Sequence, residues 1–171
     1  HKNLDNLIII LDRNNKIIAF AGRTFEDDDP AKYINSSETP IYNKSAVLYG
    51  LSDSKTYLTE KNVAIIVEGY LDYLQLYQAG IKNVAAVSGT ALTDSHAIEL
   101  NKYVQTVKKA YDGDKAGIAA AIKAGYILLR HGHNPQIINL PKNTDPDDWV
   151  YKEGPTPFKE ALILTADGVG E

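Results

Sequence analysis

The chain of 171 residues contains no cysteine and no methionine. Without cysteine it can form neither a disulfide nor a thiolate zinc site, and it has no thiol nucleophile. It also lacks the Gly-x-Ser-x-Gly motif of serine hydrolases. No apolar run is long enough to span a membrane and no signal-peptide pattern is present, so we expect no membrane partner. The absence of cysteine fits a cytoplasmic protein. Because the chain begins with His1, we expect it to be a fragment of a larger protein.

Positive charge is also scarce, because 18 basic residues face 22 acidic ones and the net charge is −4. Domains that bind nucleic acid are usually basic, so this balance predicts weak intrinsic affinity for nucleic acid. The acidity does not exclude such a partner, because bound divalent cations would offset clustered carboxylates. At this length the chain can form one core, or one core with a small additional subdomain.

Short apolar runs alternate with helical segments over most of the chain, which predicts an α/β fold with an open parallel sheet flanked by helices. We expect these strands at residues 63–67, 83–87, 106–111 and 136–140. The predicted helices cover residues 45–59, 71–79, 93–103 and 115–130, with one or two short helices after residue 146 and a frayed tail from residue 166. A β-hairpin at 7–11 and 16–21, followed by a polar loop at 26–45, predicts a small α+β subdomain in front.

Acidic residues gather at three points, each just after a predicted parallel strand. The clusters contain Glu68 with Asp72, Asp112 with Asp114, and Asp145 with Asp147. In an open parallel sheet, ligands bind outside the carboxyl ends of the strands, so the three clusters can converge on one edge. Carboxylate oxygens suit Mg²⁺, which keeps several waters for substrate phosphates to displace. The sequence therefore predicts a Mg²⁺-dependent phosphoryl-transfer site.

Each cluster taken alone has a simpler structural explanation. Asp-Gly-Asp is common in solvated turns, and Glu-Gly often closes a strand. Asp72 would suit the first turn of a helix, where the helix dipole favours acids, and Asp-Pro-Asp often begins a helix. The joint occurrence favours metal binding, because carboxylates packed together without a cation raise one another's pKa and oppose folding.

Two further groups of residues are candidates for ligand contacts. Gly89 and Thr90 precede a predicted helix and can form a phosphate-binding loop, although a plain loop with Thr93 as helix cap explains them equally well. Basic and polar side chains near the N-terminus can contact a nucleic-acid backbone, despite the acidic run at 26–29: Arg23, Lys32, Asn35 and Lys44. We expect His96, His131 and His133 to be solvated surface residues.

These motifs in combination resemble known families over residues 8–160. The segments 68–72 (EGYLD), 89–93 (GTALT), 112–114 (DGD) and 145–148 (DPDD) resemble the Toprim module of bacterial primases, topoisomerases and some nucleases. The segments 13–23 (RNNKIIAFAGR), 32–36 (KYINS), 38–45 (ETPIYNKS) and 48–51 (LYGL) are similar to the catalytic core of DnaG-type primases. Ala19, Ala21 and Asn15 depart from glycines that are usual there, which affects only the hairpin.

The resemblance implies a Toprim-type sheet and synthesis of short RNA primers on a single-stranded DNA template from ribonucleoside triphosphates. It implies Glu68, Asp112 and Asp114 as catalytic metal ligands for Mg²⁺, which Mn²⁺ can replace, with Asp72, Asp145 and Asp147 in support. Arg23, Lys32 and Lys44 match basic residues that contact template or nucleotide. The replicative helicase would be bound through a domain absent from this chain, as is the family's zinc-binding domain.

The domain organisation that follows has three parts. Residues 1–60 form the N-terminal part of the primase core, 61–153 the Toprim metal-binding domain, and 154–171 a C-terminal helical extension and tail. Two other functions stay open at this point. One is a Toprim nuclease or topoisomerase module, which would share the acids but not the segment 32–51. The other is a non-catalytic metal-binding interaction module.

Overall fold

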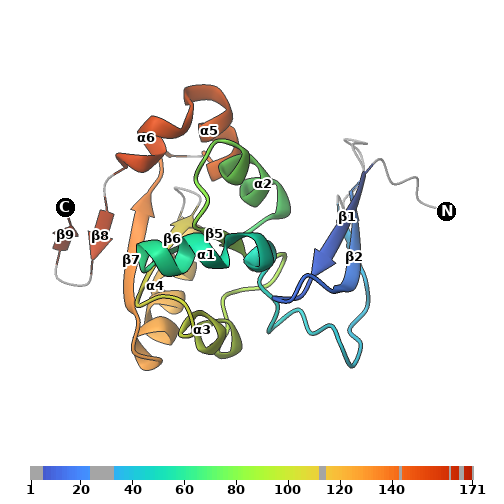
Figure 1. Cartoon of the computed structure of the whole chain (residues 1–171). Coiled ribbons are helices and arrows are strands. Elements are labelled where there is room, and N and C mark those ends of the chain that lie inside the picture. The colour runs from blue at the N-terminus through green and yellow to red at the C-terminus, as the bar shows by residue number, and fades with distance from the viewer. Residues whose placement is uncertain are drawn as a thin grey trace.

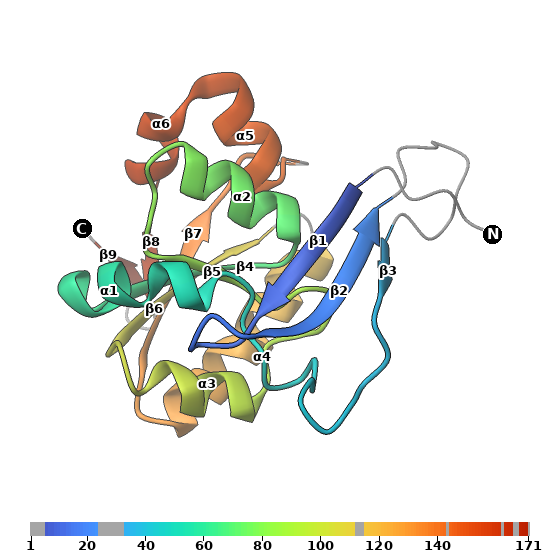
Figure 2. The ribbon, with the colours of Figure 1, turned by 45° about the vertical axis from the view of Figure 1, so that its right-hand side comes forward.

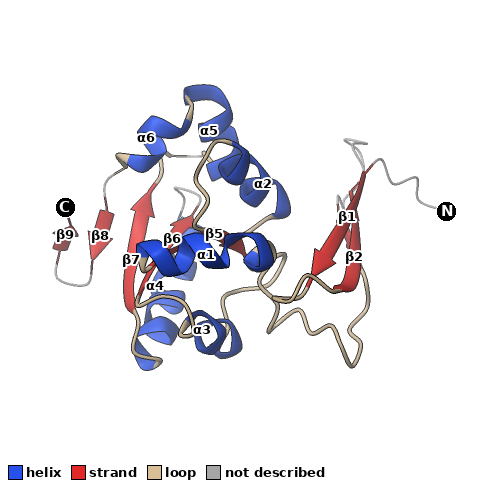
Figure 3. Cartoon of the chain, viewed as in Figure 1, coloured by secondary structure: helices blue, strands red, loops and turns tan. Residues whose placement is uncertain are grey.

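Two β-sheets organise the chain (Figures 1 and 3). The computed structural model describes residues 6–23, 33–111, 115–142, 144–161, 163–165 and 168–170. The antiparallel sheet has the order β1-β2-β3, with β1 (Asn6–Leu11), β2 (Ile17–Arg23) and β3 (Tyr33–Asn35). The larger sheet has the order β5-β4-β6-β7-β8-β9, with β4 (Val63–Val67), β5 (Val84–Ala86), β6 (Thr106–Tyr111), β7 (Asn134–Asn139), β8 (Ile163–Thr165) and β9 (Gly168–Gly170). Its first four strands are parallel, as predicted.

Helices cover both faces of the larger sheet, which explains why its central strands are continuous apolar runs. On one face lie α1 (Leu51–Lys61), α3 (Asp94–Leu100) and α4 (Lys115–Arg130). On the other lie α2 (Tyr70–Gln78), α5 (Pro146–Glu153) and α6 (Pro155–Lys159) (Figure 1). Successive residues of β4 enter opposite cores: Ile66 packs with the first group of helices, and Ile65 and Val67 with the second. All three are buried.

The small sheet begins with the predicted hairpin. The Asp12 carboxylate accepts hydrogen bonds from the backbone N–H groups of Asn14 and Lys16, at 2.8 and 2.9 Å. Asn15 takes a φ of 64°, a conformation that asparagine tolerates better than most residues. β3 was not predicted, because the sequence of residues 26–45 reads as a polar loop. It pairs with β2 in the register Gly22↔Ile34.

A third apolar cluster joins the small sheet to the start of α2, at the carboxyl edge of the larger sheet. Figure 2 shows the strands β1 and β2 in front of this edge. These strands contribute Ile8, Ile10, Ala19 and Ala21, and these side chains pack around the buried ring of Tyr70 at the start of α2. The Tyr70 hydroxyl donates a hydrogen bond of 2.7 Å to the side-chain oxygen of Asn35 in β3. The cluster and this bond fix the small sheet in front of the strand ends.

Several expectations are corrected by the structure. Residues 168–170 form β9 rather than a frayed tail, and α1 begins at Leu51 rather than near residue 45. His96 and His133 are buried. His96 lies in the first turn of α3 beside the backbone of Lys44 and Val47, and His133 contacts the backbone oxygen of Ala97 in α3 at 2.8 Å. His131 remains partly exposed and pairs with Asp94 at 2.7 Å. Among the described residues, no helix is long and apolar enough to cross a membrane.

Candidate metal and nucleotide site

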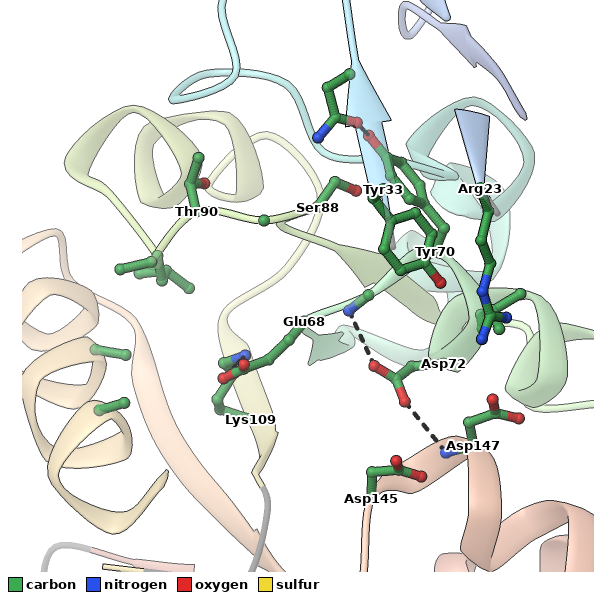
Figure 4. Close-up of a pocket in the computed structure, with 18 of the residues that line it drawn as sticks. Arg23, Tyr33, Glu68, Tyr70, Asp72, Ser88, Thr90, Lys109, Asp145 and Asp147 are labelled. Carbon is green, nitrogen blue, oxygen red and sulfur yellow. Dashed lines mark hydrogen bonds and ion pairs between the residues drawn. The ribbon is translucent and has the colours of Figure 1, made fainter. Parts of the chain in front are cut away.

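A pocket of about 830 Å³ lies at the carboxyl edge of the parallel sheet, facing the small sheet (Figure 4). We call it the edge pocket. Segments that follow three different parallel strands line it, together with the ends of β2 and β3. Its polar lining consists of Arg23, Tyr33, Asn35, Glu68, Tyr70, Asp72, Ser88, Thr90, Lys109, Lys123, Asp145 and Asp147. The predicted convergence of acids from different strand ends is therefore seen for Glu68 and Asp72 after β4 and for Asp145 and Asp147 after β7.

Glu68 follows the last residue of β4, and its side chain is 56% exposed. Its Oε1 atom lies 3.5 Å from Nζ of Lys109, a residue of β6 whose side chain is only 4% exposed. Lys109 was not among the predicted site residues. The sequence nevertheless contained a signal for it. Lys108 and Lys109 are adjacent in a predicted buried strand, and successive side chains of a strand point to opposite faces of the sheet. One of the two lysines therefore has to lie on the face that borders the pocket.

Asp72 lies in the first turn of α2 and uses both carboxylate oxygens. Oδ2 accepts a hydrogen bond of 2.9 Å from the backbone N–H of Gly69, and Oδ1 accepts one of 3.2 Å from that of Asp147 (Figure 4). Burial raises the pKa of Asp72 to about 6, with Asp145 and Asp147 adding to the rise and the two N–H groups opposing it. Through the hydrogen bond from Asp147, Asp72 fixes the position of the segment that carries Asp145 and Asp147. Its own carboxylate also lines the pocket.

The acids after β7 have different tasks. Asp145 caps α5, because its side chain accepts a hydrogen bond of 2.7 Å from the backbone N–H of Asp148. Asp147 faces the edge pocket, and burial raises its pKa, with repulsion from Asp145 and Asp148 adding to the effect. Asp148 is exposed and pairs with Lys152 at 2.9 Å, away from the lining of the pocket.

The loop after β5 has an uncommon backbone conformation. Ser88 and Gly89 take φ values of 54° and 85° in succession, which brings Gly89 against β3. A Cβ atom on Gly89 would lie 3.8 Å from the side-chain nitrogen of Asn35. The loop thus borders the pocket beside a side-chain donor, but Gly89 and Thr90 as phosphate ligands remain a prediction. The predicted helix cap is confirmed, since the Thr93 hydroxyl oxygen accepts from the N–H of His96.

The predicted nucleic-acid contacts separate into three groups. Arg23 and Asn35 line the edge pocket, with the Arg23 guanidinium 5.5 Å from the centre of the Tyr33 ring. Lys44 borders a different hollow, beside Ile10 and Tyr42. Lys32 lies outside the described residues.

Asp112 and Asp114 also lie outside the described residues. Within the part that is described, no three acidic, histidine or cysteine side chains are grouped closely enough to hold a metal ion. The acids of the edge pocket nevertheless fit a hard divalent cation, because carboxylate oxygens are the ligands that such ions prefer. Burial and mutual repulsion raise the pKa of Asp72 and Asp147, so a bound cation would relieve the repulsion between their charged forms. The ammonium group beside Glu68 shows that this carboxylate already attracts a cation.

The chain is similar in sequence and structure to known proteins. The model of Toprim-like proteins matches residues 65–150, and that of the N-terminal domain of the DNA primase catalytic core matches residues 6–55. The chain belongs to the DNA primase family. A DNA primase of Listeria monocytogenes is 40% identical over 85% of this chain, and one of Aquifex aeolicus is 39% identical over 96%.

Solved primase structures share the fold. The zinc-binding and RNA polymerase domains of the Aquifex aeolicus primase superpose with a TM-score of 0.85 at 38% identity, over 92% of this chain and 40% of that one. A DnaG primase catalytic domain bound to single-stranded DNA gives a TM-score of 0.82 at 38% identity, over 90% of this chain and 49% of that one. The chain spans 23% of the Listeria protein and 32% of the Aquifex protein. Family membership implies a divalent-metal requirement.

Proposed function

We propose that the chain is part of the RNA polymerase core of a bacterial DNA primase. The parent protein would synthesise short RNA primers on a single-stranded DNA template by Mg²⁺-dependent transfer of ribonucleotides. The observation that carries this proposal is the edge pocket, where acids after β4 and β7 face Arg23 and Asn35 of the primase-type small sheet. A replicative helicase would be contacted by parts of the parent outside this chain.

The site residues have distinct tasks in such a reaction. Glu68, Asp112 and Asp114 would hold Mg²⁺ with support from Asp145 and Asp147. When bound, Mg²⁺ neutralises charge on the transferring phosphate. Asp72 keeps the first turn of α5 against α2 through its hydrogen bond from Asp147, and so positions the supporting acids.

The remaining lining residues would bind the substrates. Arg23, Lys32, Asn35 and Lys44 would contact the template or the nucleotide. Tyr70 orients the Asn35 amide, because its hydroxyl donates to the amide oxygen and leaves the amide nitrogen on the side of Gly89. The Gly89–Thr90 turn would then lie beside the triphosphate, from which the primer 3′-oxygen displaces pyrophosphate.

A Toprim nuclease or topoisomerase would use the same acids, but it would not need the small sheet that the primase model covers at residues 6–55. A non-catalytic module would not need acids from separate strand ends directed into one open pocket. Both alternatives are therefore less well supported than primer synthesis.

The proposal is tested in the full-length parent by metal-dependent dinucleotide synthesis. Glu68→Gln and Asp112→Asn should abolish synthesis while the circular dichroism spectrum stays unchanged. Asp148→Asn is the matched control, because this acid pairs with Lys152 outside the edge pocket. Synthesis that survives both site substitutions would refute the assignment, and equal loss in the control would show that the third cluster is misassigned.

A further inference from the structure

Lys109 places a buried positive charge at the centre of the carboxyl edge. It lies in β6, opposite Ile66 of the neighbouring strand β4, and its side chain is 4% exposed. Its neighbour Lys108 points to the opposite face of the strand and is only partly buried. An ammonium group buried in this way loses much of its hydration, so it needs an anionic partner to be stable.

Glu68 provides such a partner, with 3.5 Å between Oε1 and Nζ. The two side chains differ in exposure: that of Lys109, which starts from β6, is 4% exposed, and that of Glu68, which starts just after β4, is 56% exposed. Both line the edge pocket (Figure 4). Glu68 is also the acid that the proposed function assigns to the metal. A divalent cation bound there would lie beside an ammonium of the same sign, in a partly buried place where water screens charges poorly.

We propose that the ammonium group of Lys109 is the countercharge of Glu68 in the cation-free protein, and that a divalent cation has to displace this ammonium from the carboxylate in order to bind. This inference rests on the metal site of the proposed function and adds a residue that sets its cation affinity. In the cation-free protein, Lys109 reduces repulsion among the carboxylates and holds Glu68 at the strand end. Once a cation binds Glu68, the ammonium lies next to that cation and lowers its affinity. Lys109 is thus a positioning residue rather than a metal ligand.

The test compares Lys109→Met with Lys108→Met in the 171-residue chain, with Mn²⁺ binding followed by electron paramagnetic resonance of the unbound ion. Methionine keeps the length of the side chain and removes its charge. We expect the Mn²⁺ Kd of Lys109→Met to fall about tenfold, because a like charge beside the ion is removed. Lys108→Met should change Kd less than about twofold, because that charge lies on the opposite face of the strand.

The sign of the change separates this role from a purely structural one. If Lys109 only held Glu68 in place for the metal, Lys109→Met would bind Mn²⁺ more weakly than the wild type. Weaker or unchanged affinity in the folded variant would therefore overturn the proposal. If the wild type bound no Mn²⁺ at all, the metal site of the proposed function would fail instead.

A measurement on the wild type covers the case in which Lys109→Met does not fold. With ¹⁵N-labelled lysine, the Lys109 ammonium signal should move as Mg²⁺ is titrated, since the ammonium exchanges its Glu68 contact for another environment. The Lys108 signal should stay in place. A Lys109 signal that is unchanged at saturating Mg²⁺ would show that the pair with Glu68 is not displaced.

Discussion

The carboxylate of Asp72 accepts a hydrogen bond of 3.2 Å from the backbone N–H of Asp147, which ties the first turn of α2 to the first turn of α5. The two helices pack on the same face of the parallel sheet. Through this bond, an acid that follows β4 fixes the acids that follow β7. The same carboxylate is largely removed from water, so its position has an electrostatic cost.

That cost predicts a pH dependence of stability in the absence of metal. The pKa of Asp72 is raised from 3.8 to about 6, so the folded state binds this proton more tightly than the unfolded state. Stability from this group therefore rises as the pH falls through 6 and is lost as the pH rises. By linkage, the contribution changes by about 1.4 kcal/mol between pH 7.5 and pH 5.

The measurement is urea unfolding of wild type and Asp72→Asn in EDTA at several pH values. The difference in unfolding free energy, wild type minus variant, should grow toward pH 5, because asparagine does not titrate. The lost hydrogen bond shifts the variant by the same amount at every pH and does not affect the trend. A difference that stays constant over this range would show that the pKa of Asp72 is not raised.

Divalent metal should stabilise the chain, because a cation that binds only the folded state shifts unfolding by mass action. At a metal concentration of about 100 Kd the gain is about 2.7 kcal/mol, or about 5 to 10 °C in Tm for a domain of this size. Differential scanning fluorimetry with and without Mn²⁺ measures it. Glu68→Gln and Asp112→Asn should each remove most of the shift, whereas Asp148→Asn should keep it. An unshifted wild-type Tm would contradict the metal site.

The sequence predicted the parallel strands and most helices because their signals are local. A run such as Val63–Val67 has few alternatives to a buried strand, and Asn15 and Thr93 mark a turn and a cap by their own chemistry. The convergence of the acidic clusters was predicted from the rule that the carboxyl ends of parallel strands lie at one edge of the sheet. For Glu68 and for the acids after β7, that rule was sufficient to predict their common pocket.

Features that depend on distant partners could not be predicted in the same way. β3 forms in a polar segment because β2 offers it an unpaired edge. His96 is buried because the segment that contains Lys44 and Val47 lies against it. The tie between Asp72 and Asp147 joins residues whose approach depends on the packing of two helices. Lys109 was missed because a lysine is expected to be exposed to solvent. Its position in β6, between two covered faces of the sheet, shows that its side chain is buried.

The contact between Tyr70 and Asn35 should contribute both to stability and to substrate binding. Tyr70→Phe removes the donor and leaves the Asn35 oxygen without its 2.7 Å bond, which should cost about 1 kcal/mol in urea unfolding. Affinity for single-stranded DNA should also fall, because the Asn35 amide is no longer oriented. Tyr77→Phe is the control, since that hydroxyl makes only a long, exposed bond of 3.5 Å to Asp53 and should change little. Equal effects of the two substitutions would refute the orienting role.

Gly50 and Gly80 provide a matched pair for the packing of α2. Both have positive φ, 79° and 87°, so alanine is strained at either position. At Gly50 a Cβ would also lie 2.0 Å from Cε2 of Tyr73, whereas at Gly80 nothing lies within 4 Å. Gly80→Ala should cost about 1 to 2 kcal/mol from backbone strain. Gly50→Ala should cost at least about 2 kcal/mol more, because the buried Tyr73 ring must move. Similar unfolding free energies for the two variants would contradict this packing.

Binding of single-stranded DNA by this chain should be weak and moderately dependent on salt. The chain carries a net charge of −4, and we assign phosphate contacts to three of its cations: Arg23, which lines the edge pocket, and, by prediction, Lys32 and Lys44. Each phosphate neutralised on a single strand contributes about −0.7 to the slope of log affinity against log salt. About three contacts predict a slope near −2 and a Kd in the micromolar range or above.

Fluorescence anisotropy of a labelled oligonucleotide at several salt concentrations measures this slope. Replacing Arg23 and Lys32 with alanine should flatten it to about −0.7, because two of the three contacts are removed. The matched control replaces Lys61 and Lys82, which precede β4 and β5 and so lie at the amino edge of the parallel sheet, opposite the pocket. It removes the same charge but should leave the slope near −2. An equal flattening in both double variants would mean that the slope reports net charge, and that the DNA path does not follow the small sheet.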